Sequence, residues 1–461
     1  MFVLSFNGLY NCLMHTTPGN RTMNSPSDLG KILTLQRVFI SATSIAAVLA
    51  VTILVISLVR FVKTVSANAV TEETTFVPIV STDATTSTEV IMNTELLPDN
   101  ELADQYWGEL EELPLSEVKD ITHNEIRGLY VGSGSSLDLA IERCNNSELN
   151  AIVIDLKNEW GCPFMCENET ANEIGYVWDA YDLAAVVEKC HENGIYVIGR
   201  IVCFNDCTAA EKFPERAICD IDGNPLHFKT EGKRPFLSPY NKDNWEYLIS
   251  LAEEACGYGV DEIQFDYVRF PAGSTSEGVD PYYGPEGSTP SKADAINRFL
   301  QEARIRIQDK LGVPLSADIF GIVLTSPMDA EIIGQDFATL GMTGIDSCCP
   351  MVYPSHYALG TMLNGFTFEY PDKEPYLIVY SVLQESQEIF SQEGFSTVRP
   401  YLQAFTASYI GEGNYIEYGY DEINAQIKAL HDLGIQEYIL WDPKVKYPEG
   451  PYDGNMAVPE T

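Results

Sequence analysis

The sequence predicts a (β/α)8 barrel, and three observations lead to this fold class. Eight short apolar segments alternate with amphipathic helical segments across residues 126–441. Several helical segments stop at a glycine, as at Gly194, Gly259 and Gly312, which is typical of a helix C-terminus. One of the apolar segments carries polar residues at alternate positions, as expected of a strand whose inner face lines a site.

This polar-lined strand lies in the stretch DEIQFDYVRFP, residues 261–271. Side chains alternate between the two faces of a strand, so Glu262, Gln264 and Asp266 share one face. The apolar residues between them share the other face with Tyr267 and are expected to pack under a helix. Polar groups are costly to bury without partners, so the first face is predicted to line the mouth of the barrel.

The remaining elements follow in order along the chain. The predicted strands span residues 126–131, 151–157, 195–204, 261–267, 314–321, 345–353, 398–405 and 437–441. A polar helix through residue 141 follows the first strand, and further helices are predicted at residues 183–193, 245–258, 293–311, 375–393 and 420–433. An open doubly wound sheet is the alternative, but the glycine-rich turn at 128–136 lacks the G-x-G-x-x-G spacing of that fold.

Length and charge limit the function. The chain has 461 residues, more than one compact domain of ordinary size requires, and 45% of them are hydrophobic. It carries 67 acidic and 28 basic residues, a net charge of −39. Such a chain repels nucleic acid and anionic lipid, so no nucleic-acid partner is expected. A neutral or cationic substrate is compatible with this charge.

An uncharged run at residues 38–59 is long enough to cross a bilayer as a helix, which needs about 20 apolar residues. A cleaved signal peptide is the alternative, but its apolar core has only about 7–15 residues, and Arg60 and Lys63 interrupt the approach to a cleavage site. We therefore expect a single-pass protein of the cell membrane with its long folded domain outside the cytoplasm. The predicted parts are a cytoplasmic segment (1–37), a transmembrane signal anchor (38–62), a low-complexity, disordered acidic spacer (63–122), the barrel (123–447) and a flexible tail (448–461).

The eleven cysteines show no zinc-binding pattern. Cys162 and Cys166 are spaced C-x3-C, as are Cys203 and Cys207, and two disulfides near the strand ends are an alternative if the domain is exported. The sequence also lacks a P-loop, an H-E-x-x-H motif and a G-x-S-x-G motif. No metal or other cofactor is therefore predicted.

Several long motifs resemble one known family. They read AIVIDLKNEWG, GIYVIGRIVCFND, DEIQFDYVRFP, SADIFG, PMVYPSHYALG, RPYLQAF and YILWDP. In these motifs the segment 127–447 resembles the bacterial putative glycosyl hydrolase domain family. The resemblance implies a (β/α)8 barrel in an exported or membrane-anchored protein, and it implies cleavage of glycosidic bonds in a polysaccharide or oligosaccharide.

Two carboxylates are candidates for that chemistry. Glycoside cleavage needs a carboxylic acid to protonate the leaving oxygen and a carboxylate as nucleophile or base. Asp266 and Asp318 end adjacent predicted strands, which lie about 5 Å apart, close to the separation of a retaining pair. We assign Asp266 as nucleophile and Asp318 as general acid. Asp155 is an alternative to either, unless it only pairs with Lys157.

Further residues at the strand ends are predicted to bind substrate. They are Asp155, Arg200, Arg269, Tyr353, His356, Gln403 and Trp441. Arg269 is expected either to orient Asp266 or to bind a substrate oxygen. Trp441 offers a surface on which a sugar ring can stack, or else belongs to the core. The alternative to an enzyme is a barrel that binds carbohydrate without cleaving it.

Overall fold

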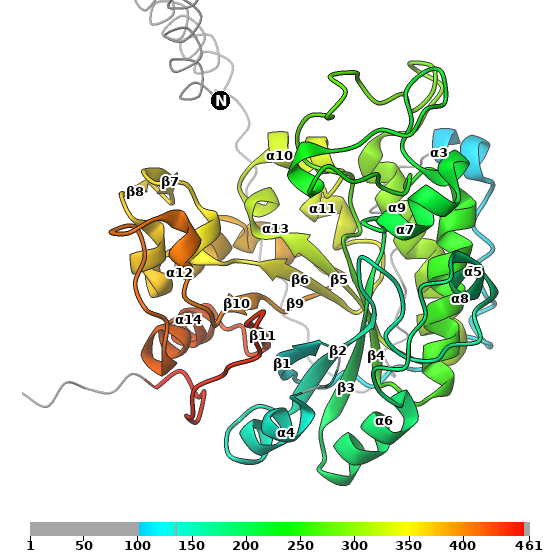
Figure 1. The fold of residues 1–461 in the computed structure, drawn as a ribbon. Coiled ribbons are helices and arrows are strands. Elements are labelled where there is room, and N and C mark those ends of the chain that lie inside the picture. Colours follow the sequence, from blue (N-terminus) through cyan, green and yellow to red (C-terminus); the bar gives the residue numbers. More distant parts are fainter. Residues whose placement is uncertain (1–100, 133, 135, 456–461) are drawn as a thin grey trace, which may run out of the picture. The chain divides into compact units, whose positions relative to one another are not determined.

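The computed structural model describes residues 101–132, 134 and 136–455, which form a closed parallel barrel (Figure 1). Its strands are β1 (Arg127–Gly132), β2 (Ala151–Lys157), β3 (Tyr196–Val202), β4 (Glu262–Asp266), β5 (Leu315–Phe320), β6 (Ser347–Met351), β9 (Thr397–Val398), β10 (Tyr401–Gln403) and β11 (Tyr438–Trp441). Pairing of Tyr401 with Met351 closes the sheet, so the open alternative is excluded. The predicted (β/α)8 barrel is confirmed.

The seventh strand is divided into two pieces. Arg399 and Pro400 separate β9 from β10, because a proline has no N–H to donate to a neighbouring strand. β9 pairs with β6, and β10 pairs with both β6 and β11. The two pieces therefore occupy the position of one strand, and the other seven predicted strands are each continuous.

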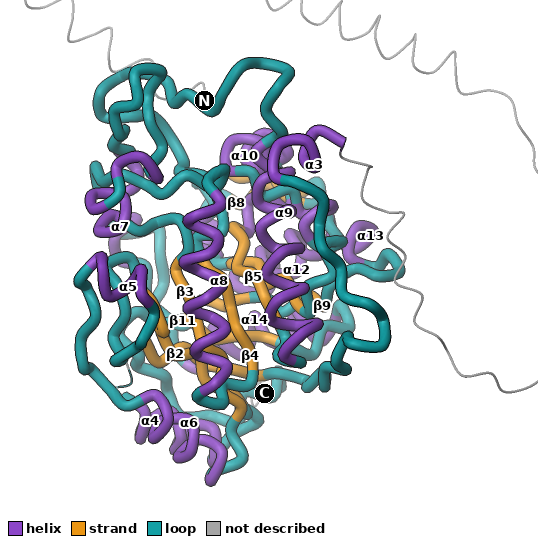
Figure 2. The backbone as a smooth tube through the Cα atoms, turned by 90° about the vertical axis from the view of Figure 1, so that its right-hand side faces the viewer, coloured by secondary structure: helices purple, strands orange, loops and turns teal. Residues whose placement is uncertain are grey.

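Helices cover the outside of the barrel. The longer ones are α4 (Leu137–Asn145), α6 (Leu183–Glu192), α8 (Lys242–Gly257), α9 (Lys292–Ala303), α12 (Pro375–Glu385) and α14 (Tyr420–Asp432). In Figure 2, α8 and α9 run across the outer face of β3, β4 and β5. Their starts are capped by Asn241 and Ser291, whose side chains accept backbone N–H groups of the first turn.

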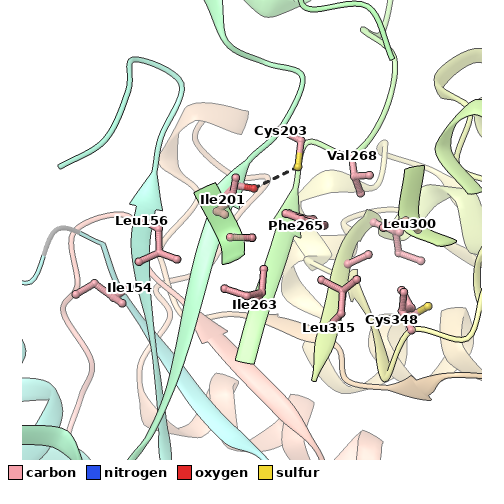
Figure 3. Packing of buried hydrophobic residues seen from close by; sticks show 14 of the residues in the cluster. Ile154, Leu156, Ile201, Cys203, Ile263, Phe265, Val268, Leu300, Leu315 and Cys348 are labelled. Atoms are coloured by element: carbon pink, nitrogen blue, oxygen red, sulfur yellow. Dashed lines mark hydrogen bonds between the residues drawn. The ribbon is translucent and has the colours of Figure 1, made fainter. Parts of the chain in front are cut away.

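An apolar layer fills the space between strands and helices. Figure 3 shows its central part, to which β2, β3 and β4 contribute Ile154, Leu156, Ile201, Ile263 and Phe265. Phe265 is fully buried, and its ring centroid lies 5.2 Å from that of Phe299 in α9. Complete burial of such a side chain contributes about 1.5–3 kcal/mol relative to exposure. The predicted outward direction of Ile263 and Phe265 is confirmed.

A separate cluster fills the inside of the barrel. Its members include Val153, Ile198, Cys349, Tyr401 and Ile439. The polar residues of β4 point into this interior as predicted, since the Gln264 side chain accepts a hydrogen bond from the Tyr401 hydroxyl at 2.5 Å. The interior therefore combines apolar side chains with a hydrogen-bonded polar pair, Gln264 and Tyr401.

The folded part begins before the predicted spacer ends. Helix α3 (Glu101–Trp107) lies on the barrel, with Trp107 stacked on Tyr240 at 5.9 Å and tilted against Trp245 at 5.3 Å. Glu112, further along, pairs with Arg304 at 2.7 Å. Residues 101–122 therefore belong to the domain, which corrects the prediction of a spacer up to residue 122. Their many acidic side chains hide this in the sequence, because few apolar residues, among them Ala103 and Trp107, provide the contact with the core.

The predicted flexible tail also begins too early. Tyr452 is fully buried, and its carbonyl oxygen accepts a hydrogen bond from the Tyr438 hydroxyl at 2.6 Å. Residues 448–455 are thus packed on the barrel. The predicted cytoplasmic segment, the signal anchor at 38–62, the first part of the spacer and the end of the tail lie outside the described residues. No helix within the described residues is long and apolar enough to cross a membrane.

Three further features were not predicted. The helix expected at 293–311 changes after α9 into a π-helical turn at Arg304–Asp309, and the helix expected at 375–393 divides into α12 and α13 (Gln387–Phe390). A hairpin of β7 (Thr361–Leu363) and β8 (Phe366–Phe368) follows β6.

The ten cysteines in the described part of the chain are all unpaired.

Candidate active site

Charged side chains from three strands meet at the C-terminal mouth of the barrel. Asp155 comes from β2, Arg200 from β3 and Asp266 from the end of β4. Each lies on the inner face of its strand, since the neighbouring residues on either side face the helices. Arg200 donates to Asp155 Oδ1 at 2.5 Å through Nη1 and to Asp266 Oδ2 at 2.5 and 3.0 Å through Nη2 and Nε. All three are at most 6% exposed, so Arg200 holds both carboxylates in a desolvated network.

Asp155 does not pair with Lys157, which was the structural alternative for this residue. A bulge between the two residues turns Lys157 to the outside of the barrel, where it pairs with Asp206 at 2.9 Å. Tyr130 of β1 instead donates to Asp155 Oδ2 at 2.7 Å. Asp155 thus accepts hydrogen bonds from two side chains, Arg200 and Tyr130, one through each carboxylate oxygen. Asp266 differs in that a side chain binds only its Oδ2, while its Oδ1 accepts the backbone N–H of Tyr267 at 2.5 Å.

Asp318 of β5 differs from the other two carboxylates. The pairing of β4 with β5 places Phe265 opposite Ala317, so the next residues, Asp266 and Asp318, lie at the same height on adjacent strands. Asp318 is 2% exposed, and its Oδ1 has no hydrogen-bond partner among the described residues. Burial and the negative charge of Asp266 raise the pKa of Asp318 well above its usual range, and Arg200 offsets only part of this. These surroundings therefore favour the protonated form of Asp318.

Aromatic rings border this network. The rings of Tyr130 and Trp441 lie 4.0 Å apart between centroids, and the Arg200 guanidinium lies 5.6 and 5.5 Å from them. Tyr353 is buried just after β6, and burial together with the charge of Asp318 raises the pKa of its hydroxyl. Trp441 thus lies beside Arg200 and Tyr353 beside Asp318, both at the mouth. Tyr130 was missed, although its inward position in the first strand could have indicated it.

Arg269 lies away from Asp266. Its Nη1 donates to Glu231 at 3.2 Å and to the Phe270 carbonyl at 2.9 Å. The chain turns at Tyr267, which has a φ of 50°, so the alternation of the strand ends there. Arg269 does not orient Asp266, and Arg200 performs that function. Arg269 instead holds the segment around Glu231 against the end of β4.

Gln403 serves a structural role in place of the expected substrate contact, whereas His356 lies where a substrate could reach it. Gln403 is fully buried, accepts the Ser355 N–H at 3.0 Å and donates to Asp372 at 2.8 Å, so it joins the two ends of the loop after β6. Asp372 lies in a loop whose course cannot be predicted from the sequence. His356 is exposed at the border of the mouth. Its ring is edge-on to that of Tyr353, with 4.9 Å between the ring centroids.

Comparisons with known proteins agree with this architecture. A hypothetical protein from Ruminiclostridium thermocellum ATCC 27405 is 36% identical over 41% of this chain and 96% of that chain, with a TM-score of 0.37. The PgaB (BpsB) glycoside hydrolase domain from Bordetella bronchiseptica is 12% identical over 69% of this chain and 94% of that chain, with a TM-score of 0.51, which shows a shared fold. No curated protein matches the sequence.

The sequence model of one family covers most of the chain. It is described as the putative glycosyl hydrolase domain and matches residues 126–447, which include every strand of the barrel and all the mouth residues described above. This match confirms the resemblance that the motifs indicated. The chain therefore belongs to the putative glycosyl hydrolase domain family.

Proposed function

We propose that this protein is a retaining glycoside hydrolase that cleaves a cell-surface or extracellular polysaccharide. The observation that carries the proposal is the unequal pair of carboxylates at the mouth. Asp266 is bound by Arg200, whereas Asp318 beside it is buried, has an unpartnered oxygen and has a raised pKa. Two neighbouring carboxyl groups in such different environments support one acid and one carboxylate at the same pH.

In this mechanism Asp318 transfers its proton to the glycosidic oxygen while the bond to the leaving sugar breaks. Asp266 attacks the anomeric carbon and forms a covalent glycosyl-enzyme ester. Asp318, now deprotonated, then takes a proton from a water molecule, which attacks the anomeric carbon and releases Asp266. The two inversions together retain the configuration of the sugar.

Strand register supports retention over inversion. Neighbouring strands lie about 4.7–4.9 Å apart, and the two aspartates follow the paired residues Phe265 and Ala317. A retaining pair needs a separation of about 5–5.5 Å, whereas an inverting pair needs about 6.5–9.5 Å to admit a water molecule. We further propose that the apolar run at residues 38–59 anchors the chain in the cell membrane, with the barrel outside the cytoplasm.

Hydrolysis of a panel of bacterial cell-wall and plant polysaccharides tests the activity. Asp318→Asn is expected to reduce cleavage of natural linkages by about 10²–10⁴-fold, because general acid catalysis is lost. With an aryl glycoside whose activated leaving group needs no proton, the same variant should form the glycosyl-enzyme at a nearly unchanged kcat/KM. Its kcat should stay low, because Asp318 is also the base that activates the attacking water. Asp155→Asn is the matched control, since it alters a carboxylate of the same network that transfers no proton.

Two results would overturn the proposal. If Asp318→Asn lost kcat/KM equally on activated and natural substrates, Asp318 would not be the general acid. A wild-type protein that binds a glycan but cleaves none, with binding unaffected by Asp266→Asn, would establish the non-catalytic alternative. NMR of the first-formed anomer decides the stereochemistry, and an inverted product would exclude Asp266 as nucleophile.

A further inference from the structure

A groove lies outside the barrel, between the β7–β8 hairpin and α12, which are side by side at the left edge of Figure 1. It has a volume of about 630 Å³, within the range of about 300–1,000 Å³ that is usual for ligand sites. All its lining residues lie between Asn364 and Gln384. Helix α12 provides one side, and the hairpin with the segment that follows it provides the other.

The lining combines aromatic rings with hydrogen-bonding groups. Tyr376 and Tyr380, one helical turn apart on α12, present nearly parallel rings 5.7 Å apart. Facing them are Phe366 and Tyr370, whose side chains are 65% and 42% exposed. Aromatic side chains gathered in one groove, unlike single exposed rings, are typical of a binding site. Their faces suit the apolar C–H face of a sugar ring.

The polar groups indicate that the ligand is neutral. The amides of Asn364 and Gln384 are hydrogen-bonded to each other at one end of the groove, and can also reach hydroxyl groups of a ligand. Glu369 and Glu374 outnumber the single basic residue of the lining, Lys373, which lies over the Tyr370 ring at 4.5 Å. An anionic ligand would be repelled by this lining and by the net charge of −39.

The groove belongs to the same loop that borders the proposed active site. The loop leaves β6 at residue 352, passes Tyr353 beside Asp318, forms the hairpin and enters α12 at Pro375. Most loops of this type in barrels have about 2–6 residues, and longer ones at the C-terminal end usually serve binding or catalysis. The same loop therefore carries both Tyr353, beside Asp318, and the aromatic groove.

We propose that this groove is an accessory site that binds a neutral polysaccharide chain away from the point of cleavage. The proposal rests on the proposed function, because it assumes that the substrate is a polysaccharide. Stacking of sugar rings on the aromatic side chains and hydrogen bonds from Asn364 and Gln384 hold the chain. The site increases the time that a long substrate spends near Asp266 and Asp318.

Affinity electrophoresis of the full chain in mild detergent tests the site. Native gels contain mixed-linkage β-glucan, xylan, galactomannan or amylose, with anionic polygalacturonate as a comparison. Phe366→Ala/Tyr370→Ala removes two exposed rings with little effect on folding. Met362→Ala is the matched control, because Met362 is 70% exposed on β7 of the same hairpin and does not line the groove. Melting temperatures of all variants are measured in parallel.

At least one neutral polysaccharide should retard the wild type, and polygalacturonate should not. The double variant should bind that polysaccharide about ten-fold or more weakly, a change of about 1.4 kcal/mol, because it loses two of the stacking surfaces. Met362→Ala should bind as the wild type does.

The two proposals can fail separately. Equal retardation of the double variant and the wild type overturns the accessory site, whether or not the enzyme cleaves the polysaccharide. Groove-dependent retardation without cleavage of any substrate supports the site and overturns the hydrolase. No retardation in any gel overturns a glycan ligand, and the exposed rings would then indicate a protein partner.

Discussion

The two ends of the barrel both bury charged clusters, but they balance the charges differently. At the N-terminal end, Arg399 donates to Glu262 and to Glu437 at 2.7 Å. His123 adds a second basic group, with contacts of 3.3 Å to Asp346 and 2.8 Å to Glu437. Each carboxylate at this end therefore contacts at least one basic side chain.

At the C-terminal end, a single arginine lies among three carboxylates and binds only two of them. Arg200 binds Asp155 and Asp266, and Asp318 has no hydrogen bond to it. Burial raises the pKa of Glu262 as well as that of Asp318, but only Glu262 has an arginine in contact. The comparison teaches that burial of charge alone does not mark a site. An excess of acid with an unpartnered oxygen separates a reactive cluster from a structural one.

The largest effect is expected from two substitutions on the same face of β4. Asp266→Asn should lower kcat/KM by more than about 10³-fold while the melting temperature stays close to that of the wild type. Glu262→Gln, four residues earlier, should cost roughly 3–5 kcal/mol of unfolding free energy because it leaves Arg399 incompletely paired. Steady-state kinetics, corrected for the folded fraction, measures kcat/KM, and urea unfolding measures the free energy of unfolding. If Glu262→Gln reduced kcat/KM as strongly as Asp266→Asn, the contrast between the two ends would be wrong.

A smaller effect is expected when each arginine becomes lysine. Lysine cannot form the forked contacts of arginine, so Arg200→Lys should lower kcat/KM by about ten- to a hundred-fold through misplacement of Asp266. Arg399→Lys should lower stability and leave kcat/KM of the folded fraction unchanged. Steady-state kinetics beside thermal unfolding distinguishes the two. A loss of activity in both variants would mean that the Arg399 cluster at the N-terminal end also helps to position the residues of the mouth.

The pH dependence of stability should identify Asp318. Its pKa is raised in the folded chain, so the stability it contributes is complete below the unfolded pKa of about 3.9. Above that value the unfolded chain releases the proton first, and stability falls until the pH passes the folded pKa. Asp318→Asn cannot ionise and should raise the melting temperature at neutral pH by a few degrees while activity is lost. Identical pH curves for the variant and the wild type would contradict a raised pKa.

The smallest effect is expected at His123, which is 44% exposed at its side chain. Partial burial opposes protonation, but the charges of Asp346 and Glu437 outweigh it and raise the pKa of His123. Its contribution is therefore complete below about pH 6.5 and disappears as the pH rises through the folded pKa. His123→Gln should lower stability by less than about 1 kcal/mol at pH 5 and by nothing at pH 9. A loss of equal size at both values would show a contribution from packing alone.

The sequence was sufficient for the strands and for the central carboxylates. The alternation around Asp266 predicts which side chains enter the barrel, and parallel strands bring their C-terminal ends together. Asp155, Arg200, Asp266 and Asp318 follow this rule, and they meet or lie side by side in the structure. The rule holds only within a strand, because beyond it the backbone no longer alternates.

The errors begin where the strands end. Arg269 was misplaced because the turn at Tyr267 breaks the alternation, and nothing in the sequence identifies Glu231 as its partner. Gln403 was assigned to substrate because its partner Asp372 lies in a loop of unknown course. Trp107 was missed because its contacts are distant in the chain and its neighbours are acidic. In each case a long-range contact decided the outcome.

The clamp formed by Gln403 has a consequence for the evolution of related chains. It binds Ser355 before the hairpin and Asp372 after it, so the stretch between them is closed at its base by one barrel side chain. A closed loop can gain or lose residues with only a small change in closure entropy. One insertion or deletion between these two residues would add or remove the groove without altering β6 or β10. The groove can thus vary between related chains while the charged cluster at the mouth stays the same.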